Sequence, residues 1–200
     1  MPDLVANMVA GSELILGGQK SGKSRRAELL ARDWLQQSTY HKAVLIATAQ
    51  PWDEEMRQRI TRHQRDRAER VPGLTTVEEP LQLVQTITQL SQPDTLLVVD
   101  CLTLWLTNLL MPADFENTPK NQSNIRIAVD LIGNTAMLAV AISEATGPVV
   151  IVSNEIGLGV IPMGHDVRAF VDALGKLNQD VAQTCEKVTF MAAGLPLSLK

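Results

Sequence analysis

The sequence is poor in cysteine and in net charge, and each shortage excludes a class of protein. Its two cysteines, Cys101 and Cys185, lack the CxxC or Cys/His spacing of a metal or redox site. They indicate reduced, buried thiols in a reducing compartment. The net charge of −4 over 200 residues argues against a nucleic-acid binder that works through a broad basic face.

Segments that would take the chain into or across a membrane are also missing from the sequence. No apolar run reaches the ~18 to 20 residues that a bilayer span requires. Residues 1–12 lack the charged-then-apolar layout of a signal peptide, and we expect them to form an N-terminal tail. The sequence therefore predicts a cytoplasmic protein in which residues 13–200 form a single domain.

What the sequence does contain is a regular alternation of short apolar runs with helical patterns. The runs that predict strands lie at residues 14–16, 44–49, 75–77, 96–100, 149–153 and 188–191. The helical patterns lie at residues 22–37, 53–70, 80–90, 102–110, 125–145 and 166–185, and a mobile loop is predicted at 112–124. This alternation predicts an α/β fold: a mostly parallel sheet with helices on both faces. Ligands of such sheets bind beyond the carboxyl ends of the strands.

The clearest functional motif has the form GxxxxGK[ST] and lies between a predicted strand and a predicted helix. Its glycines let backbone amides approach phosphate oxygens, and the helix that follows points free N–H groups at the same anion. Lys23 is placed to reach the β- and γ-phosphates, and the Ser24 hydroxyl to bind Mg²⁺. The motif predicts a P-loop for ATP or GTP. Its eight residues are Gly17, Gly18, Gln19, Lys20, Ser21, Gly22, Lys23 and Ser24.

Two further polar segments follow predicted strands and are expected at the same edge of the sheet. Asp100 ends an apolar strand, where the acidic residue on the magnesium side of P-loop enzymes usually lies. A strand-end aspartate also commonly shapes a turn, but the P-loop favours a metal role, so Ser24 and Asp100 are the candidate Mg²⁺ ligands. For Asn154 and Glu155 we prefer a role in shaping the turn that follows them.

His63 is the histidine for which the sequence suggests a chemical role. Met56, Ile60, His63 and Arg67 are spaced to share one face of a helix. The arginines around His63 attract phosphate and favour neutral, nucleophilic imidazole. A solvated basic helix shows the same pattern, so both interpretations stay open on the pattern alone. The other two histidines, at positions 41 and 165, are given no role.

Eight characteristic segments follow one another from about Ser12 to the end of the chain. They are GGQKSGKS (17–24), IATAQ (46–50), DEEMRQRITRHQRDR (53–67), TVEEP (76–80), VVDCLTLWLTNLL (98–110), SNEIGLGVIP (153–162), RAFVDALGKLNQ (168–179) and AGLPLSLK (193–200). Together they resemble the bifunctional adenosylcobinamide kinase/adenosylcobinamide-phosphate guanylyltransferase family of cobalamin biosynthesis. The P-loop alone does not single out this family, whereas the combination of segments is specific.

The resemblance implies an enzyme with two activities. Family members phosphorylate the aminopropanol hydroxyl of adenosylcobinamide with ATP or GTP. They then transfer GMP from GTP to that phosphate through a guanylylated histidine, which gives adenosylcobinamide-GDP and pyrophosphate. His63 matches the histidine nucleophile, and His63 and Lys23 are thus the expected catalytic residues. Mg²⁺ is the expected cofactor, and a corrinoid and nucleotides are the expected substrates.

The resemblance also implies further nucleotide-binding residues and an assembly. The residues are Ala47, Thr48 and Ala49 at a strand end, Gln64, Arg65, Asp66 and Arg67 beside the histidine, and the acidic Glu78 and Asp100. Family members are homotrimers whose sheets resemble the RecA-like P-loop core. No nucleic acid and no membrane span is expected among the partners.

Two other functions stay open on the sequence. One is a P-loop kinase of a different small alcohol, in which His63 only helps to bind phosphate. The other is a nucleotide-binding regulatory or assembly module with weak hydrolysis. The regulatory module is disfavoured because it gives the histidine helix no purpose.

Overall fold

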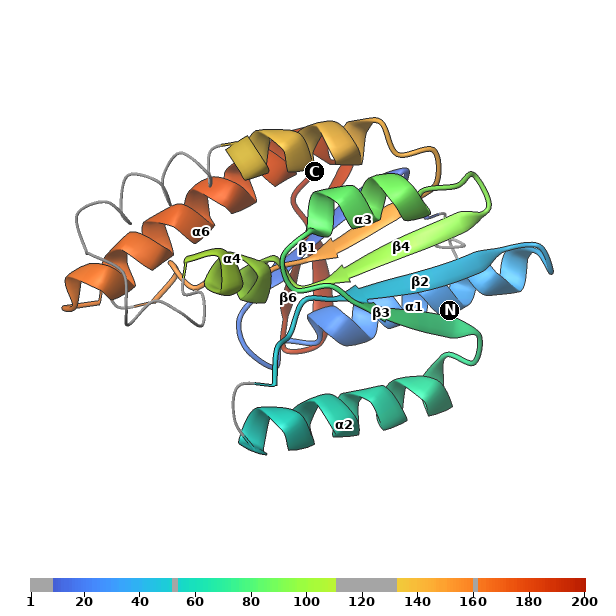
Figure 1. The fold of residues 1–200 in the computed structure, drawn as a ribbon, viewed down its shortest axis with the longest axis horizontal. Helices are drawn as coiled ribbons and strands as arrows, with labels where there is room; N and C mark the ends of the chain where they lie inside the picture. Colours follow the sequence, from blue (N-terminus) through green and yellow to red (C-terminus); the bar gives the residue numbers. More distant parts are fainter. Residues whose placement is uncertain (1–8, 52–53, 111–132, 160–161) are drawn as a thin grey trace.

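The computed structural model describes residues 9–51, 54–110, 133–159 and 162–200, which build one sheet with helices on both faces (Figure 1). Four expectations fall wholly or partly outside these residues: most of the N-terminal tail, the helix start at residue 53, the loop at 112–124 and the first part of the helix at 125–145. The first strand begins at Ser12, one residue before the boundary that we drew between tail and domain.

Seven strands form the sheet in the order β3-β2-β4-β5-β1-β6-β7. They are β1 (Ser12–Gly17), β2 (Lys42–Ala47), β3 (Leu74–Glu78), β4 (Thr95–Asp100), β5 (Val149–Val152), β6 (Lys187–Ala192) and β7 (Leu195–Ser198). Neighbouring strands pair in parallel, except that β7 is antiparallel to β6. This confirms the predicted mostly parallel sheet. The strand β5 lies between β1 and β4 in this order.

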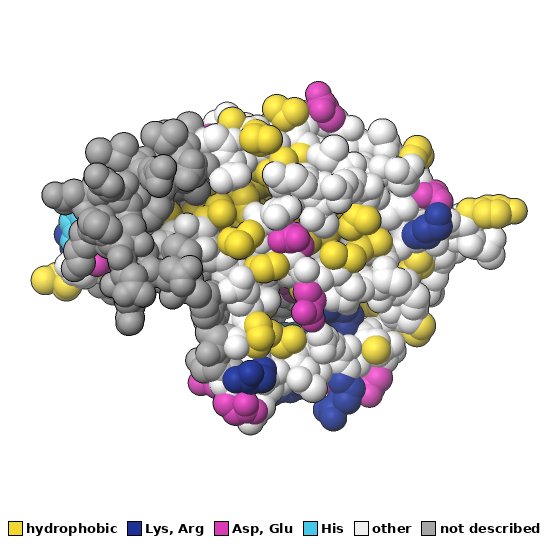
Figure 2. Space-filling model, in the orientation of Figure 1, with side chains coloured by type: hydrophobic (Ala, Val, Ile, Leu, Met, Phe, Trp, Pro, Cys, Tyr) yellow, Lys and Arg dark blue, Asp and Glu magenta, His cyan; other side chains and the backbone are white. Residues whose placement is uncertain are grey.

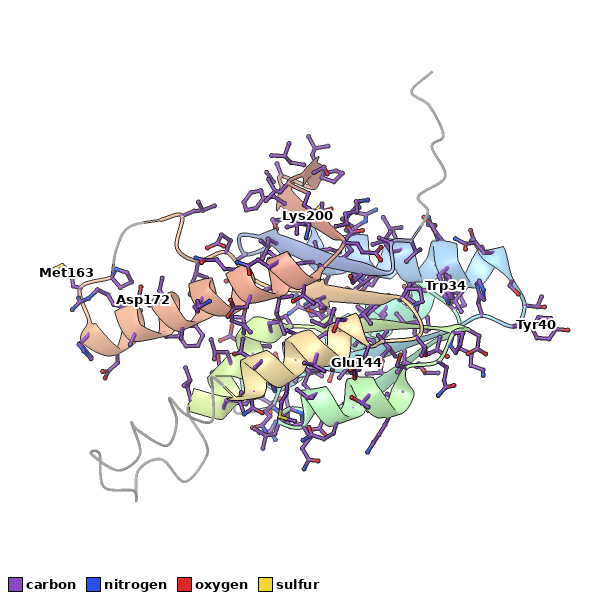
Figure 3. All side chains as sticks on the ribbon, turned by 90° about the horizontal axis from the view of Figure 1, so that it is seen from above. Trp34, Tyr40, Glu144, Met163, Asp172 and Lys200 are labelled. Atoms are coloured by element: carbon purple, nitrogen blue, oxygen red, sulfur yellow. The ribbon has the colours of Figure 1, made fainter. Side chains whose placement is uncertain are left out.

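The helices cover both faces of the sheet, as the alternating pattern predicts. They are α1 (Lys23–Gln37), α2 (Glu54–Arg70), α3 (Leu83–Leu90), α4 (Leu102–Leu110), residues 133–143 and α6 (His165–Thr184). α1 and α2 lie on one face, while α3, α4, residues 133–143 and α6 lie on the other (Figures 1 and 3). None of the described helices is long and apolar enough to cross a membrane.

The central strands β1, β4 and β5 are buried on both sides because each side packs against helices. Successive strand residues point to opposite faces, so β1 divides its side chains between two cores. Leu14 and Leu16 join the core under α3, α4 and α6, while Ile15 joins the core under α1. β4 divides its residues in the same way. Burial on both sides therefore anchors the carboxyl ends of these two central strands.

The final strand, β7, was not predicted from the sequence. It forms a hairpin with β6 through Ala193 and Gly194, which both have positive φ angles, 52° and 82°. Two-residue hairpin turns of this kind favour residues that tolerate positive φ, and Asn-Gly is the usual signal. Pro196 is compatible with β7 because the strand lies at the edge of the sheet.

Gly147 lies where the fold leaves no room for a side chain. A Cβ atom there would lie 2.0 Å from the backbone oxygen of Gln92 and 2.5 Å from that of Thr95. We expect Gly147→Ala to lower the free energy of unfolding by about 1–3 kcal/mol, because overpacking forces backbone to shift. The control is Gly175→Ala on α6, where a Cβ meets nothing within 4 Å. Urea unfolding measures both variants, and an unchanged midpoint for Gly147→Ala contradicts the prediction.

Candidate active site

The loop between β1 and α1 requires glycine at two positions. Gly17 and Gly22 have φ angles of 150° and 101°, in the region that favours glycine. A Cβ on Gly17 would lie 2.5 Å from the backbone oxygen of Met191, and one on Gly22 would lie 3.2 Å from the Cα of Gly194. The glycines of the motif thus serve both the turn and the close packing of the loop on the β6–β7 hairpin.

Two backbone hydrogen bonds hold the loop between β1 and α1 in place, and neither could be predicted from the sequence. The Gly194 amide donates to the Ser21 carbonyl over 3.0 Å, and the Glu155 amide donates to the Gly17 carbonyl over 3.1 Å. The hairpin turn and the segment after β5 therefore fix the shape of the loop. Within the turn that follows, the Gly157 amide donates to Oε1 of Glu155 over 3.4 Å, as expected of the turn-shaping role that we preferred for Glu155.

Lys23 is the first residue of α1, and its side chain is only partly accessible. Its Nζ donates to the Gly18 carbonyl over 2.6 Å, which holds the ammonium group over the loop. Burial lowers the pKa of Lys23, while the nearby Asp100 carboxylate opposes that shift. An ammonium group that is poorly hydrated and lies near a helix N-terminus is suited to binding phosphate oxygens.

A cavity of about 430 Å³ opens between the carboxyl ends of the strands and α2. This is where parallel sheets bind their ligands. Residues that are far apart in the sequence meet there, from the loop, from the strand ends and from α2. The predicted site residues that line the cavity are Gln19, Lys23, Ser24, Ala47, Ala49, His63, Gln64, Arg67, Glu78 and Asp100.

The remaining predicted site residues do not line the cavity. They are Gly17, Gly18, Lys20, Ser21, Gly22, Thr48, Arg65 and Asp66. The loop residues among them are expected to act through backbone amides, which needs no side chain in the cavity. Arg65 instead lines a second groove along α2 together with Arg57 and Arg62. A nucleotide contact by Arg65, or by any other of these eight predicted residues, stays a prediction.

Thr48 has a structural task that was not predicted. Its hydroxyl donates to the Cys101 carbonyl over 2.7 Å and accepts from the Cys101 amide over 2.9 Å. The side-chain amide of Asn108 donates to the carbonyls of Thr48 and Pro80, over 2.8 and 3.0 Å. These contacts tie the ends of β2 and β4 together and so set the position of Asp100.

The face of α2 that the sequence predicted is the face that borders the cavity. Met56, Ile60, His63 and Arg67 all line it. The side chain of His63 is exposed, whereas Arg67 is buried. Lys and Arg side chains gather on α2 at the lower edge of Figure 2, with acidic side chains beside them. The imidazole thus faces the cavity of the P-loop within a basic surrounding.

Several lining residues were not assigned to the site from the sequence. They are Pro51, Met56, Arg57, Ile60, Thr61, Thr76, Cys101, Leu104, Val152 and Asn154. Asn154 follows β5, and its backbone and side-chain amides donate to the Thr103 hydroxyl over 3.0 and 3.1 Å. The sequence placed Asn154 at this edge of the sheet but favoured a role in shaping the turn, and the strand order brings it beside the cavity because β5 lies between β1 and β4.

Both thiols are expected to react slowly although Cys101 borders the cavity. Burial raises the pKa of Cys101 to about 11 and that of Cys185 to about 12. Both groups therefore stay protonated at pH 8, and the thiolate is the reactive form. We expect the folded protein to react with a disulfide reagent at least about tenfold more slowly than the unfolded chain. A fast phase of one thiol in the folded protein contradicts this.

Comparison with known proteins identifies the family of the chain. The sequence profile described as cobinamide kinase / cobinamide phosphate guanyltransferase matches residues 13–199. The bifunctional adenosylcobalamin biosynthesis protein CobP of Pseudomonas aeruginosa is 44% identical over 188 residues, 94% of this chain and 96% of that protein. CobU of Salmonella typhimurium, of the same description, is 32% identical over 94% of this chain and 98% of its own length.

Among solved structures, the flagellar accessory protein FlaH of Methanocaldococcus jannaschii aligns with a TM-score of 0.48 and 12% identity. That alignment covers 96% of this chain and 79% of FlaH. The family assignment rests instead on the sequence matches, which extend over nearly all of the chain and of its relatives. With the P-loop, Asp100 and the histidine helix around one cavity, the chain belongs to the cobinamide kinase / cobinamide phosphate guanyltransferase family.

Proposed function

We propose that this chain phosphorylates adenosylcobinamide with ATP or GTP and then transfers GMP from GTP to the new phosphate through His63. The observation that carries the proposal is that His63, Lys23, Ser24 and Asp100 line one cavity. A triphosphate on the P-loop therefore lies in the same space as the imidazole. The match to bifunctional relatives over nearly the full chain supports both activities.

Mg²⁺ fits the oxygen atoms that this site offers. The Ser24 hydroxyl and the Asp100 carboxylate both line the cavity. The described residues contain no group of three or more His, Cys, Asp or Glu that could hold a metal by themselves. Mg²⁺ characteristically takes one or two protein oxygens and completes its shell with phosphates and water. When bound there, the ion neutralises charge on the phosphates during transfer.

In the kinase step, the P-loop and Lys23 hold the triphosphate while the aminopropanol hydroxyl attacks the γ-phosphorus. The new O–P bond forms as the bond to the β–γ bridging oxygen breaks, the nucleoside diphosphate leaves and the hydroxyl proton is released. Such transfers depend mainly on positioning and on charge neutralisation. Lys23 serves the second of these because its ammonium group lies over the loop.

In the guanylyl step, a ring nitrogen of His63 attacks the α-phosphorus of GTP. The P–N bond forms, the bond from the α-phosphorus to the α–β bridging oxygen breaks, and pyrophosphate leaves. A phosphate oxygen of adenosylcobinamide phosphate then attacks the same phosphorus, and the P–N bond breaks. The covalent intermediate divides one displacement into two. Arg67, one helical turn from His63, adds positive charge to the cavity wall.

Trapping of the intermediate tests the proposal. The protein incubated with Mg²⁺ and α-labelled GTP should acquire label that is lost in acid and stable in alkali, as expected of a phosphohistidine. GTP labelled at the γ-position should leave none. Cobinamide-dependent consumption of ATP separates the enzyme from a regulatory nucleotide-binding module. Absence of the α-labelled adduct contradicts the role of His63.

We extend the proposal to the assembly and the compartment that the family resemblance implies, a homotrimer in the cytoplasm. Light scattering on the purified protein should then give a mass three times the chain mass of 21.9 kDa. A monomeric mass at working concentrations contradicts the trimer and leaves the proposed chemistry unchanged.

A further inference from the structure

Glu28 is a buried carboxylate of α1 that no step of the proposed reaction uses. Its side chain is 3% exposed, and both of its oxygens meet arginines from α2. Arg70 donates from Nε to Oε2 over 2.8 Å and from Nη2 to Oε1 over 3.2 Å. The Nε of Arg67 lies 3.6 Å from Oε1. Glu28 thus links the helix that follows the P-loop to the helix that carries His63.

The two arginines are held in different ways. Arg70 bonds to both oxygens of Glu28, the two-point geometry that fixes a guanidinium group most firmly. Arg67 is attracted by charge alone, because its buried Nε makes no hydrogen bond to the described residues. Its Nη1 donates to the hydroxyl of Thr76 on β3 over 3.3 Å. Arg67 is therefore positioned while part of its guanidinium group still faces the cavity.

These contacts determine the rotation of α2 about its own axis. Arg67 and Arg70 are three residues apart and lie on neighbouring positions of one helical face. His63 lies four residues before Arg67, one turn along the same face. An α-helix turns by about 100° per residue, so a small rotation of the anchored turn moves the imidazole around the axis. Holding two arginines at one carboxylate therefore also holds the direction in which His63 points.

Net stability is a poor explanation for this arrangement. Removal of the Glu28 carboxylate and the Arg67 guanidinium group from water is costly, and apolar packing of similar volume is often at least as stabilising as a buried ion pair. What the ion pair supplies is a defined geometry, because charge and hydrogen-bond direction both fix where α2 lies relative to α1. That geometry sets the position of His63 relative to the P-loop.

We propose that Glu28 is a positioning residue for guanylyl transfer, acting through Arg67 and Arg70 to present His63 to the α-phosphate. This inference rests on the proposed function, in which His63 is the nucleophile. The kinase step does not use His63, so loss of the Glu28 contacts should separate the two activities. A residue that only stabilises the fold would lower both together.

The test compares the rate of adduct formation from α-labelled GTP with the rate of cobinamide phosphorylation in the same preparations. Glu28→Gln should lower the adduct rate by about 10- to 100-fold, because misplacement of a reacting group by ~1 Å costs on that order. The phosphorylation rate should stay within about threefold of the unmodified protein. Glu28→Asp keeps the charge and should recover part of the adduct rate.

If Glu28→Gln folds poorly, Arg70→Gln tests the same proposal in its place. Arg70 does not line the cavity, and its side chain is 42% exposed, so the fold should tolerate the change. It should shift the ratio of the two rates in the same direction. Combining it with Glu28→Gln should add little beyond the single variants, because both remove one interaction. Fully additive losses overturn the proposal.

Glu13→Gln is the matched control, because Glu13 is an equally buried carboxylate that pairs with Arg26 of α1 rather than with α2. It should lower the melting temperature without changing the ratio of the two rates. An unchanged adduct rate in Glu28→Gln, or an equal fall in both rates, overturns the positioning role alone. No adduct in the unmodified protein overturns the proposed function, and the positioning role with it.

Discussion

Lys23→Ala is expected to lower the rates of both half-reactions by about 100- to 1000-fold, the usual cost of removing a charge-stabilising group. The ammonium group lies over the P-loop at the start of α1, where it neutralises phosphate charge in either step. The side chain is 7% exposed, and Lys23 is the only lysine of the described residues that lines the cavity. The effect should therefore appear in cobinamide-dependent ATP consumption and in adduct formation from GTP.

Lys42→Ala is the control for the loss of a lysine. Lys42 begins β2, and its side chain is 69% exposed and pairs with Asp94 over 3.1 Å. Exposed ion pairs contribute little to the free energy of unfolding. The rates of both half-reactions and the unfolding midpoint should therefore stay close to those of the unmodified protein. A Lys23→Ala protein that folds and retains either half-reaction at full rate contradicts the assignment of Lys23 to a shared phosphate site.

The sequence predicts those elements of the fold whose buried residues form a continuous or regularly repeating apolar pattern. β1 and β4 contain uninterrupted apolar runs at residues 14–16 and 96–99 because helices cover both of their faces, and such runs stand out in a sequence. The hairpin strand β7 has no comparable signal. All four of its residues are exposed, it contains Pro196, and Ala193 occupies a turn position where Asn is usual. Its place in the fold depends on pairing with β6, which local sequence does not encode.

The sequence predicts those site residues that belong to a local motif or lie at the end of a predicted strand. The P-loop is contiguous, Asp100 ends β4 and Asn154 lies two residues after β5, so topology alone brings them to one edge. The contacts that hold these groups join distant residues. Thr48 and Asn108 are ordinary polar residues in the sequence, and their hydrogen bonds join segments about 60 positions apart.

Glu28 is a charged residue whose contacts could likewise not be predicted from the sequence. On a helix, a glutamate next to arginines is typical of a solvated surface, and nothing local marks this one as buried. Its partner Arg70 lies 42 positions away on another helix. Burial of the carboxylate becomes evident only when α1 and α2 are placed relative to each other.

His63→Ala is expected to abolish formation of the guanylylated protein while it spares much of the phosphorylation. No other histidine can replace it within the described part of the chain, because His41 stacks on Trp34 at a ring distance of 3.7 Å and His165 lies at the start of α6. Residual transfer directly from GTP should be slow, since the covalent route is lost. Labelled GTP and mass spectrometry of the intact chain measure the adduct.

His165→Ala is the matched control, because its imidazole is 86% exposed and does not line the cavity. It should form the adduct at the rate of the unmodified protein. Phosphorylation by His63→Ala shows at the same time that its P-loop is intact, so a missing adduct cannot be ascribed to lost nucleotide binding. If His63→Ala still forms the acid-labile adduct, another residue is the nucleophile, and the face of α2 that borders the cavity serves binding alone.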